Sequence, residues 1–233
     1  MEFLINRYFL LALTFGAFLA GRRLQRWAGG TPLLNPILLA IMIVILWLVA
    51  TGTPHSAYQP AGDYIDFWLK PAVVALGVPL SQQLKVIRRQ LLPILLAETI
   101  GCLVGIVSVV LFAEAFGASR EVLLSLVPKS VTTPIAIEVS QTIGGIPALT
   151  AAVVVATGIF GSMAGFKMMS ISRIKSPIAQ GLSMGTAAHA VGTSAALDRS
   201  ARYGAFSSLG LILNGLLTAI LAPSILALMG YGV

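Results

Sequence analysis

Long apolar runs dominate this chain and limit the folds open to it. A membrane-spanning helix needs about 20 consecutive apolar residues, and the chain holds six runs near that length: 3–20, 34–51, 64–80, 91–113, 146–166 and 205–229. Of its 233 residues, 57% are hydrophobic and 10% are charged, whereas a soluble domain carries about 25% charged residues. A water-soluble fold would expose too much apolar surface. The pattern therefore predicts an all-α, polytopic transmembrane protein.

The charged residues between the runs indicate its orientation. By the positive-inside rule, segments rich in Lys and Arg face the cytoplasm, and four groups qualify: Arg22, Arg23 and Arg26; Lys85, Arg88 and Arg89; Lys167, Arg173 and Lys175; Arg199 and Arg202. The N-terminus is then outside. This topology accounts for the net charge of +7, so we expect no nucleic-acid partner. Met1–Ala20 is expected to be a membrane helix rather than a cleaved signal peptide, because its arginines follow the apolar run.

Two less apolar stretches, 121–145 and 177–197, are rich in Gly, Ser, Thr and Pro. The loop at 114–120 is predicted outside and the loop at 167–175 inside, so the chain between them must cross the membrane an odd number of times. Two segments lie between these loops, 121–145 and 146–166, and 146–166 is the more apolar of the two. We therefore predict that 146–166 crosses and that 121–145 enters the membrane and returns outside. The same count predicts that the second returns to the cytoplasm. The alternative, in which both stretches cross fully, places the basic loop outside, against its charge.

The chain thus repeats a broken element followed by a spanning helix, with the two units inverted relative to each other. "SVTTPIAIEVS" at 130–140 and "SMGTAAHAVGTS" at 183–194 are loosely similar. Inverted repeats with discontinuous helices near the bilayer midplane are typical of secondary transporters. We expect a single transmembrane domain over 1–233, with scaffold helices in 1–60. The transport core, 61–233, would contain both discontinuous or re-entrant segments.

The stretch "SLVPKSVTTPIAIEVSQTIGG" at 125–145 is the strongest candidate for a binding site. Its two prolines interrupt helix, and irregular backbone at membrane depth is tolerated only where protein buries it or water reaches it. An ammonium group, hydroxyls and free backbone N–H groups suit a small carboxylate. This predicts substrate-binding roles for Lys129, Ser130, Thr132 and Thr133. The alternative is a lysine that extends to the membrane surface, with hydroxyls bonded to the broken helix.

The second stretch, "GLSMGTAAHAVGTSAALD" at 181–198, adds a histidine and further hydroxyls. His189 is predicted to contact a substrate carboxylate or a coupling proton, with Thr186 and Thr193 as substrate-binding neighbours. A packed structural histidine is the alternative. Two carboxylates within apolar surroundings, Glu138 and Glu98, are candidates for proton coupling. For Glu138, the alternatives are an ion pair with Lys129 and a place at the outer, solvated end of the hairpin. For Glu98, a structural hydrogen bond is the alternative.

The sequence contains few motifs that are typical of enzymes or metal sites. No CxxC, HExxH, Walker or dinucleotide-binding pattern is present, so we expect no metal, no cofactor and no enzymatic activity. G-x-S-x-G occurs at 181–185, but without the preceding strand and the residue order of a nucleophile elbow. An intramembrane protease that uses Ser183 and His189 is the alternative. Asn214, in the last apolar run, is best explained by an interhelical hydrogen bond.

The longer motif "SLVPKSVTTPIAIEVSQTIGGIPALTA", together with "GTAAHAVGTSAAL" and "VPLSQQLKVIRR" at 78–89, closely resembles the LrgB/CidB family of bacterial membrane proteins. The resemblance covers most of the chain. One departure is Ser81, where the family pattern leads us to expect an aromatic residue.

The resemblance implies two alternative functions. Family members are described as modulators of murein hydrolase export and autolysis that work with a small holin-like LrgA/CidA membrane partner. Related proteins include a plastid glycolate/glycerate translocator and bacterial proteins associated with pyruvate uptake. We therefore expect an alternating-access transporter of small 2-oxo or 2-hydroxy monocarboxylates, homodimeric and in the bacterial inner membrane. The alternative is a holin/antiholin-like modulator without a substrate of its own.

Overall fold

The computed structural model describes residues 6–31, 34–75 and 77–232. These residues form α-helices and connecting turns, with no β-strand among them. The prediction of an all-α polytopic fold is therefore confirmed. The chain divides into two compact units, Met1–Leu76 and Gly77–Val233. This boundary lies beyond the division after residue 60 that the sequence suggested, and the single-domain organisation stays a prediction.

The first unit contains α2 (Arg7–Trp27), α3 (Pro36–Thr51) and α4 (His55–Ala75). Asparagines cap α2 and α3, each accepting a backbone N–H with its side-chain oxygen, as expected for this residue at an N-cap. Small residues let α2 and α3 approach, because a Cβ at Gly21 would lie 3.2 Å from the carbonyl oxygen of Pro36. A 2.9 Å hydrogen bond between Thr14 and Tyr58 joins α2 to α4.

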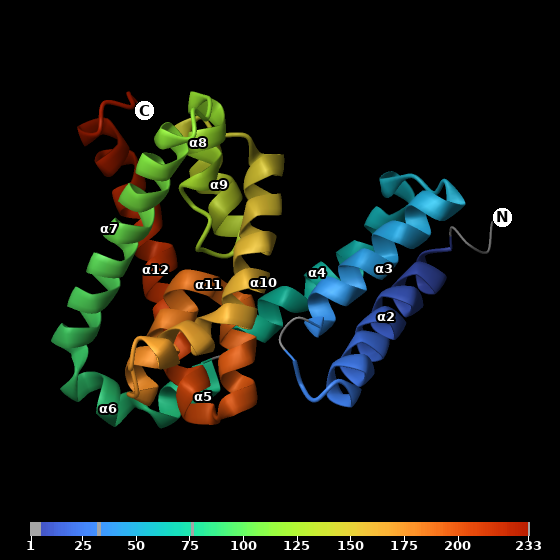
Figure 1. Ribbon diagram of the computed structural model, residues 1–233, viewed down its shortest axis with the longest axis horizontal. Helices are drawn as coiled ribbons and strands as arrows, with labels where there is room; N and C mark the ends of the chain where they lie inside the picture. Colours follow the sequence, from blue (N-terminus) through green and yellow to red (C-terminus); the bar gives the residue numbers. More distant parts are fainter. Residues whose placement is uncertain (1–5, 32–33, 76, 233) are drawn as a thin grey trace. The chain divides into compact units, whose positions relative to one another are not determined.

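The second unit holds the remaining helices (Figure 1): α5 (Gly77–Gln82), α6 (Leu84–Arg89), α7 (Leu91–Ala115), α8 (Arg120–Leu126), α9 (Thr133–Ile143), α10 (Pro147–Ile171), α11 (Pro177–Arg199) and α12 (Ala201–Leu228). Within the described part of the chain, α7, α10 and α12 are long and apolar enough to cross a membrane, and α3 is a shorter apolar helix. The apolar run predicted at 64–80 is divided between α4 and α5, and α4 begins well before that run.

Helices α8 and α9 form the first hairpin, residues 120–143. The chain after α9 returns to the start of the hairpin, where Ile146 donates its N–H to the Ser125 hydroxyl at 2.7 Å. The Thr150 hydroxyl donates to the Ser125 carbonyl at 3.0 Å. Gly144 makes the turn out of α9 with a φ of 85°, a conformation that glycine adopts without a Cβ clash. Both helices therefore lie at the end of the unit where α7 finishes and α10 begins (Figure 1).

Helix α11 is a second hairpin, residues 177–199, because Ala188 and His189 have non-helical dihedral angles. The two halves lie side by side: Ala196 packs with Met184 in one buried cluster. Both halves also reach the same residue of α12, since a Cβ at Gly185 would lie 2.0 Å from the Ser207 carbonyl oxygen, and the Thr193 and Ser207 hydroxyls are 2.9 Å apart.

The two hairpins start from opposite ends of the second unit. The second hairpin lies at the end that carries α5 and α6 (Figure 1), together with the three basic groups around residues 85–89, 167–175 and 199–202. The second unit thus contains three long helices, α7, α10 and α12, and two elements that turn back. Re-entry of these hairpins into a bilayer stays a prediction.

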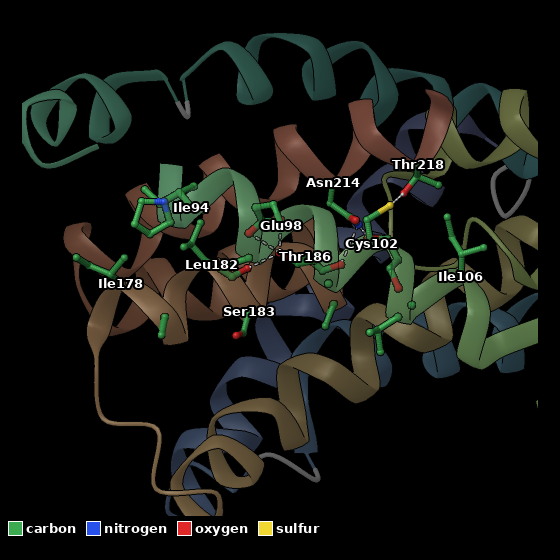
Figure 2. A pocket seen from close by; sticks show the side chains of 18 of the residues that line it. Ile94, Glu98, Cys102, Ile106, Ile178, Leu182, Ser183, Thr186, Asn214 and Thr218 are labelled. Carbon is green, nitrogen blue, oxygen red and sulfur yellow. Dashed lines mark hydrogen bonds between the residues drawn. The ribbon is translucent and has the colours of Figure 1, made fainter. Parts of the chain in front are cut away.

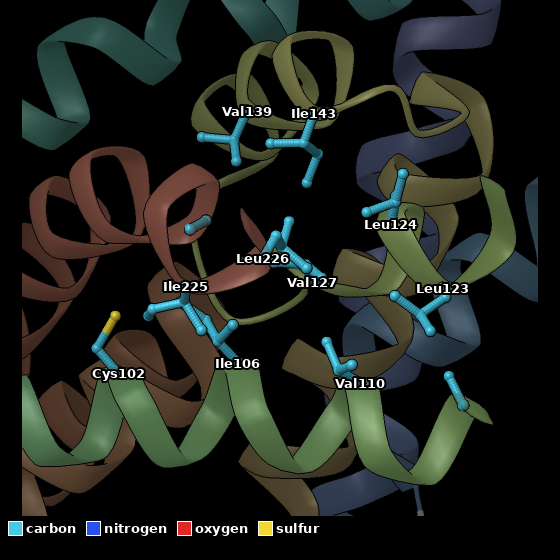
Figure 3. Packing of buried hydrophobic residues seen from close by; sticks show 12 residues of the cluster. Cys102, Ile106, Val110, Leu123, Leu124, Val127, Val139, Ile143, Ile225 and Leu226 are labelled. Atoms are coloured by element: carbon cyan, nitrogen blue, oxygen red, sulfur yellow. The ribbon is translucent and has the colours of Figure 1, made fainter. Parts of the chain in front are cut away.

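Apolar side chains fix the first hairpin against two of the long helices (Figure 3). One buried cluster joins α7, the hairpin and α12 through Ile106, Val110, Leu124, Ile143 and Leu226. Each buried side chain of this size contributes about 1.5–3 kcal/mol relative to exposure to water. In a membrane the hydrophobic effect does not drive helices together, and close van der Waals packing stabilises their association instead. The packing of these apolar side chains therefore holds the hairpin against α7 and α12.

Gly185→Ala tests the packing of α11 on α12. We expect a destabilisation of at least about 1–3 kcal/mol, as for other overpacked sites, because the new Cβ would collide with the backbone oxygen of Ser207. Thermal unfolding in detergent measures it. Gly16→Ala is the control, since a Cβ there meets nothing within 4 Å. Equal unfolding temperatures for the two variants would contradict this packing.

Candidate functional site

A cavity of about 650 Å³ lies within the second unit (Figure 2). Its volume falls within the range of small-molecule sites, about 300–1,000 Å³. The wall is formed by α7, the tip of the first hairpin, the first half of α11 and the middle of α12, with Thr157 from α10. Polar side chains on this wall include Glu98, Lys129, Ser130, Thr157, Ser183, Thr186 and Asn214.

Lys129 is the one cation among the described residues that line the cavity. It lies at the tip of the first hairpin, in the turns between α8 and α9, and it is half-buried. Its ammonium group donates to the Gly105 carbonyl oxygen of α7 at 3.2 Å. Gly105 has open space where a Cβ would stand, so the lysine reaches the backbone directly. One of its three N–H groups is thereby used, and the others are available to a ligand.

Asn214 of α12 ties the two hairpins together. Its side-chain amide donates to the Ser130 carbonyl at 3.3 Å and to the Thr186 carbonyl at 3.0 Å. The first acceptor is at the tip of one hairpin and the second lies just before the kink of the other. Carbonyls in the last turn before a helix break lack their usual partners. Asn214 is 2% exposed, so it supplies these partners where water has little access.

Glu98 of α7 faces the second hairpin. Both oxygens of its carboxyl group lie close to the Thr186 hydroxyl oxygen, at 2.8 and 2.7 Å (Figure 2). The same hydroxyl lies 2.8 Å from the Leu182 carbonyl oxygen. Gly101 makes room for this contact, because its Cβ would lie 3.3 Å from the Thr186 methyl group. Glu98 is 2% exposed.

His189 and Thr193 lie outside the residues that line the cavity. The His189 ring nitrogen Nε2 is 2.9 Å from the Val154 carbonyl oxygen of α10, and the ring packs where a Cβ of Gly158 would stand. With φ at 41°, His189 holds a backbone conformation that costs about 1–3 kcal/mol for a non-glycine residue. Its side-chain contacts fix the kink of the second hairpin. This arrangement matches the alternative of a packed structural histidine.

Three further predicted residues also lie outside the cavity lining. Thr132 is the N-cap of α9 without a side-chain capping bond, and Thr133 begins that helix. Glu138 is exposed on α9, and its carbonyl oxygen accepts from Thr142. The structure therefore brings together four of the nine residues named from the sequence: Glu98, Lys129, Ser130 and Thr186.

Three polar residues of the wall were not named as site residues from the sequence. The interhelical hydrogen bond expected of Asn214 is present, to the Thr186 carbonyl of α11, and the same amide also donates to the Ser130 carbonyl. Thr157 lies in the apolar run at 146–166, where nothing in the sequence distinguishes it. It belongs to the site because its side chain lines the cavity. Ser183 was considered only as a protease nucleophile. The structure pairs His189 with Val154 instead, and Ser183 faces the cavity. For Asn214, an amide side chain within an apolar run was the available signal.

The fold and the cavity define a polytopic α-helical membrane protein with a polar site in a partly open cavity. A model of the LrgB-like family matches residues 14–228. The chain is 34% identical over 219 residues to the holin-like protein CidB of Staphylococcus epidermidis (strain RP62A), covering 94% of this chain and 95% of that protein. It is 35% identical over 214 residues to the uncharacterized protein YxaC of Bacillus subtilis (strain 168), covering 92% and 93%.

A third relative is the holin-like protein CidB of Staphylococcus aureus (strain Mu50), 33% identical over 224 residues, with 96% of this chain and 97% of that protein covered. No solved structure matches significantly. The chain belongs to the LrgB-like family. The resemblance seen in its motifs is confirmed, and the protein is a bacterial membrane protein.

Asn214→Leu tests the bridge between the hairpins. The variant leaves two carbonyl groups without their side-chain donor, and each unsatisfied buried group costs about 1–3 kcal/mol. We expect a clear fall in the unfolding temperature in detergent. Ser208→Ala on the same helix is the control, because its hydroxyl donates only within α12, to Gly204. If both variants unfold at the wild-type temperature, the amide does not hold the hairpin tips.

Proposed function

We propose that this protein is a membrane carrier of small 2-oxo or 2-hydroxy monocarboxylates, the class of pyruvate, glycolate and glycerate. The observation that carries the proposal is the half-buried Lys129, whose ammonium group lies on the wall of a partly open cavity of about 650 Å³. A cation at membrane depth is costly and marks a substrate or ion pathway in most membrane proteins. An anion of this class is small enough to enter with part of its hydration shell.

The residues around the cavity supply the contacts that such an anion needs. The carboxylate would accept from the N–H groups of Lys129 that the Gly105 carbonyl leaves available, and a bond between two ionised groups is stronger than a neutral one. The Ser130 hydroxyl, at the same hairpin tip, would donate to the second carboxylate oxygen. Across the cavity, the hydroxyls of Thr157 and Ser183 can donate to a 2-oxo group or accept from a 2-hydroxyl group.

Alternating access would act through the two hairpins. Their tips meet at Asn214, and the hairpins start from opposite ends of the unit (Figure 1). Discontinuous segments that meet near the midplane form the substrate sites of many secondary transporters. Movement of one hairpin tip would open the cavity to one side, and movement of the other would open it to the opposite side.

Charge supports one orientation in the bacterial inner membrane. The end that carries α6 and the 167–175 loop would face the cytoplasm, and the N-terminus of the chain would lie outside. A homodimer and an LrgA/CidA-like membrane partner remain part of this proposal. Both are compatible with the many exposed apolar side chains of α7 and α12, such as Phe112 and Leu216.

The second candidate is a holin-like modulator of murein hydrolase export and autolysis with no substrate. The names of the CidB relatives favour it. That role does not by itself require a lysine and several hydroxyls around an internal cavity.

Lys129→Gln separates the two candidates. Purified protein in proteoliposomes should take up labelled pyruvate or glycolate, and the variant should lose roughly 10-fold or more, as expected when a charged hydrogen bond is lost. Lys167→Gln is the matched control, because Lys167 is exposed at the end of α10. Wild-type protein that moves no small carboxylate would exclude the carrier. Equal uptake by wild type and the Lys129 variant would exclude Lys129 as the anion site.

Cysteine labelling tests the course of the first hairpin. In a Cys102→Ala background, Ser119→Cys and Gln141→Cys stand at the two ends of the hairpin, and Ser172→Cys follows α10; all three positions are exposed. A membrane-impermeant maleimide should label the first two from outside the cell. It should label Ser172→Cys only in inverted vesicles. Labelling of Ser119→Cys and Gln141→Cys from opposite sides would show that the segment crosses fully.

A further inference from the structure

Glu98 is a buried carboxyl group without a cation. It lies on the cavity wall and is 2% exposed, and no described residue forms an ion pair with it. Lys129 lines the same cavity, but its ammonium is bonded at Gly105. Gly105 lies seven residues further along α7, which is about 10 Å along a helix. An ionised carboxylate in such surroundings is strongly penalised unless it is paired.

The hydrogen bonds around Glu98 need one more proton than the hydroxyl can supply. The Thr186 hydroxyl oxygen lies 2.7–2.8 Å from both Glu98 oxygens and from the Leu182 carbonyl. A hydroxyl has one hydrogen to donate and accepts with its lone pairs. With a charged carboxylate, the hydroxyl serves either Glu98 or Leu182, and the other oxygen faces a lone pair. A protonated carboxyl donates to Thr186 through one oxygen while Thr186 donates to Leu182, so the carboxyl group, the hydroxyl and the Leu182 carbonyl each have a hydrogen-bond partner.

We propose that Glu98 is a proton-binding site, and that its protonation keeps the second hairpin against α7. The proton is taken from water in the cavity onto a carboxyl oxygen of Glu98. Loss of that proton to water leaves a carboxylate that needs solvation, which requires the hairpin residue Thr186 to move away from α7. Because the Thr186 carbonyl is bonded to Asn214, this movement reaches the first hairpin as well. The inference rests on the proposed transport function.

Other titratable groups around Glu98 do not offer the same chemistry. On its own helix, Cys102 is buried, with its sulfur 3.4 Å from the Thr218 hydroxyl. The first hairpin contributes Lys129, and the cavity-lining residues of α11 and α12 carry no titratable side chain. The short helix α6 carries Lys85, Arg88 and Arg89, which are exposed. Glu138, the other carboxylate predicted for proton coupling, is exposed on α9.

Two carboxyl-to-amide variants test the assignment in proteoliposomes with labelled pyruvate or glycolate. Glu98→Gln keeps a hydrogen-bonding side chain of the same size but cannot release a proton. We expect it to retain exchange of internal for external substrate and to lose accumulation driven by a pH gradient. Glu138→Gln should behave as wild type in both assays. Gradient-driven accumulation that survives in Glu98→Gln, or is absent from wild-type protein that does exchange substrate, would overturn the proposal.

Infrared spectroscopy of the wild-type protein gives a second readout that needs no transport. Apart from Glu98, the described carboxylates whose side chains can be placed, Asp63, Glu114, Glu121, Glu138 and Asp198, are exposed. A protonated-carboxyl band that shifts in D₂O and is lost at high pH is expected, and it should be missing in Glu98→Gln. Absence of the band in wild type at neutral pH would overturn the proton site, even if the amide variant does not fold. If wild-type protein shows the protonated-carboxyl band but transports no substrate, the proposed transport function is overturned and the proton site is not.

Discussion

Every backbone polar group at membrane depth must find a partner within the protein, and this requirement shapes the second unit. Two hairpins interrupt regular helix there, so their tips contain carbonyl groups without helical partners. Asn214 satisfies one carbonyl from each tip. At the base of the first hairpin, Ser125 accepts the N–H of Ile146. With these bonds in place, irregular backbone can surround a cavity, and the position of each tip depends on the other.

The parts of this arrangement that depend on local signals could be predicted from the sequence. Apolar length located the cores of α7, α10 and α12, and loop charge with Pro and Gly placement located the two elements that turn back. Lys129, Ser130 and Thr186 followed from residue type within those elements. The start of α4 was missed, because a helix from His55 with two internal prolines contradicts the usual local rules. The role of His189 depends on the direction of one side chain at a kink, which residue type does not determine.

Close glycine contacts indicate which parts of the unit move as one body. A Cβ at Gly185 would collide with the backbone of α12, and Cβ atoms at Gly158 and Gly161 would collide with His189 and Ala188 of the second hairpin. Such interlocked surfaces slide poorly. The contact between α7 and the second hairpin is different, since it rests on the polar pair of Glu98 and Thr186 beside the cavity. If α7 separates from the second hairpin while α10, α11 and α12 stay together, the close glycine contacts among those three helices are preserved.

The two proposed ligands also explain why one cation and one carboxyl group share a cavity. With Lys129 charged, the empty site is neutral overall when Glu98 is ionised, and the loaded site is neutral when Lys129 holds an anion and Glu98 holds a proton. A site that holds the anion while Glu98 is ionised would carry a net negative charge, which is penalised in a low-dielectric interior. Closure of the second hairpin over the anion therefore requires the proton on Glu98 as well, which couples the two ligands without any direct contact between Lys129 and Glu98.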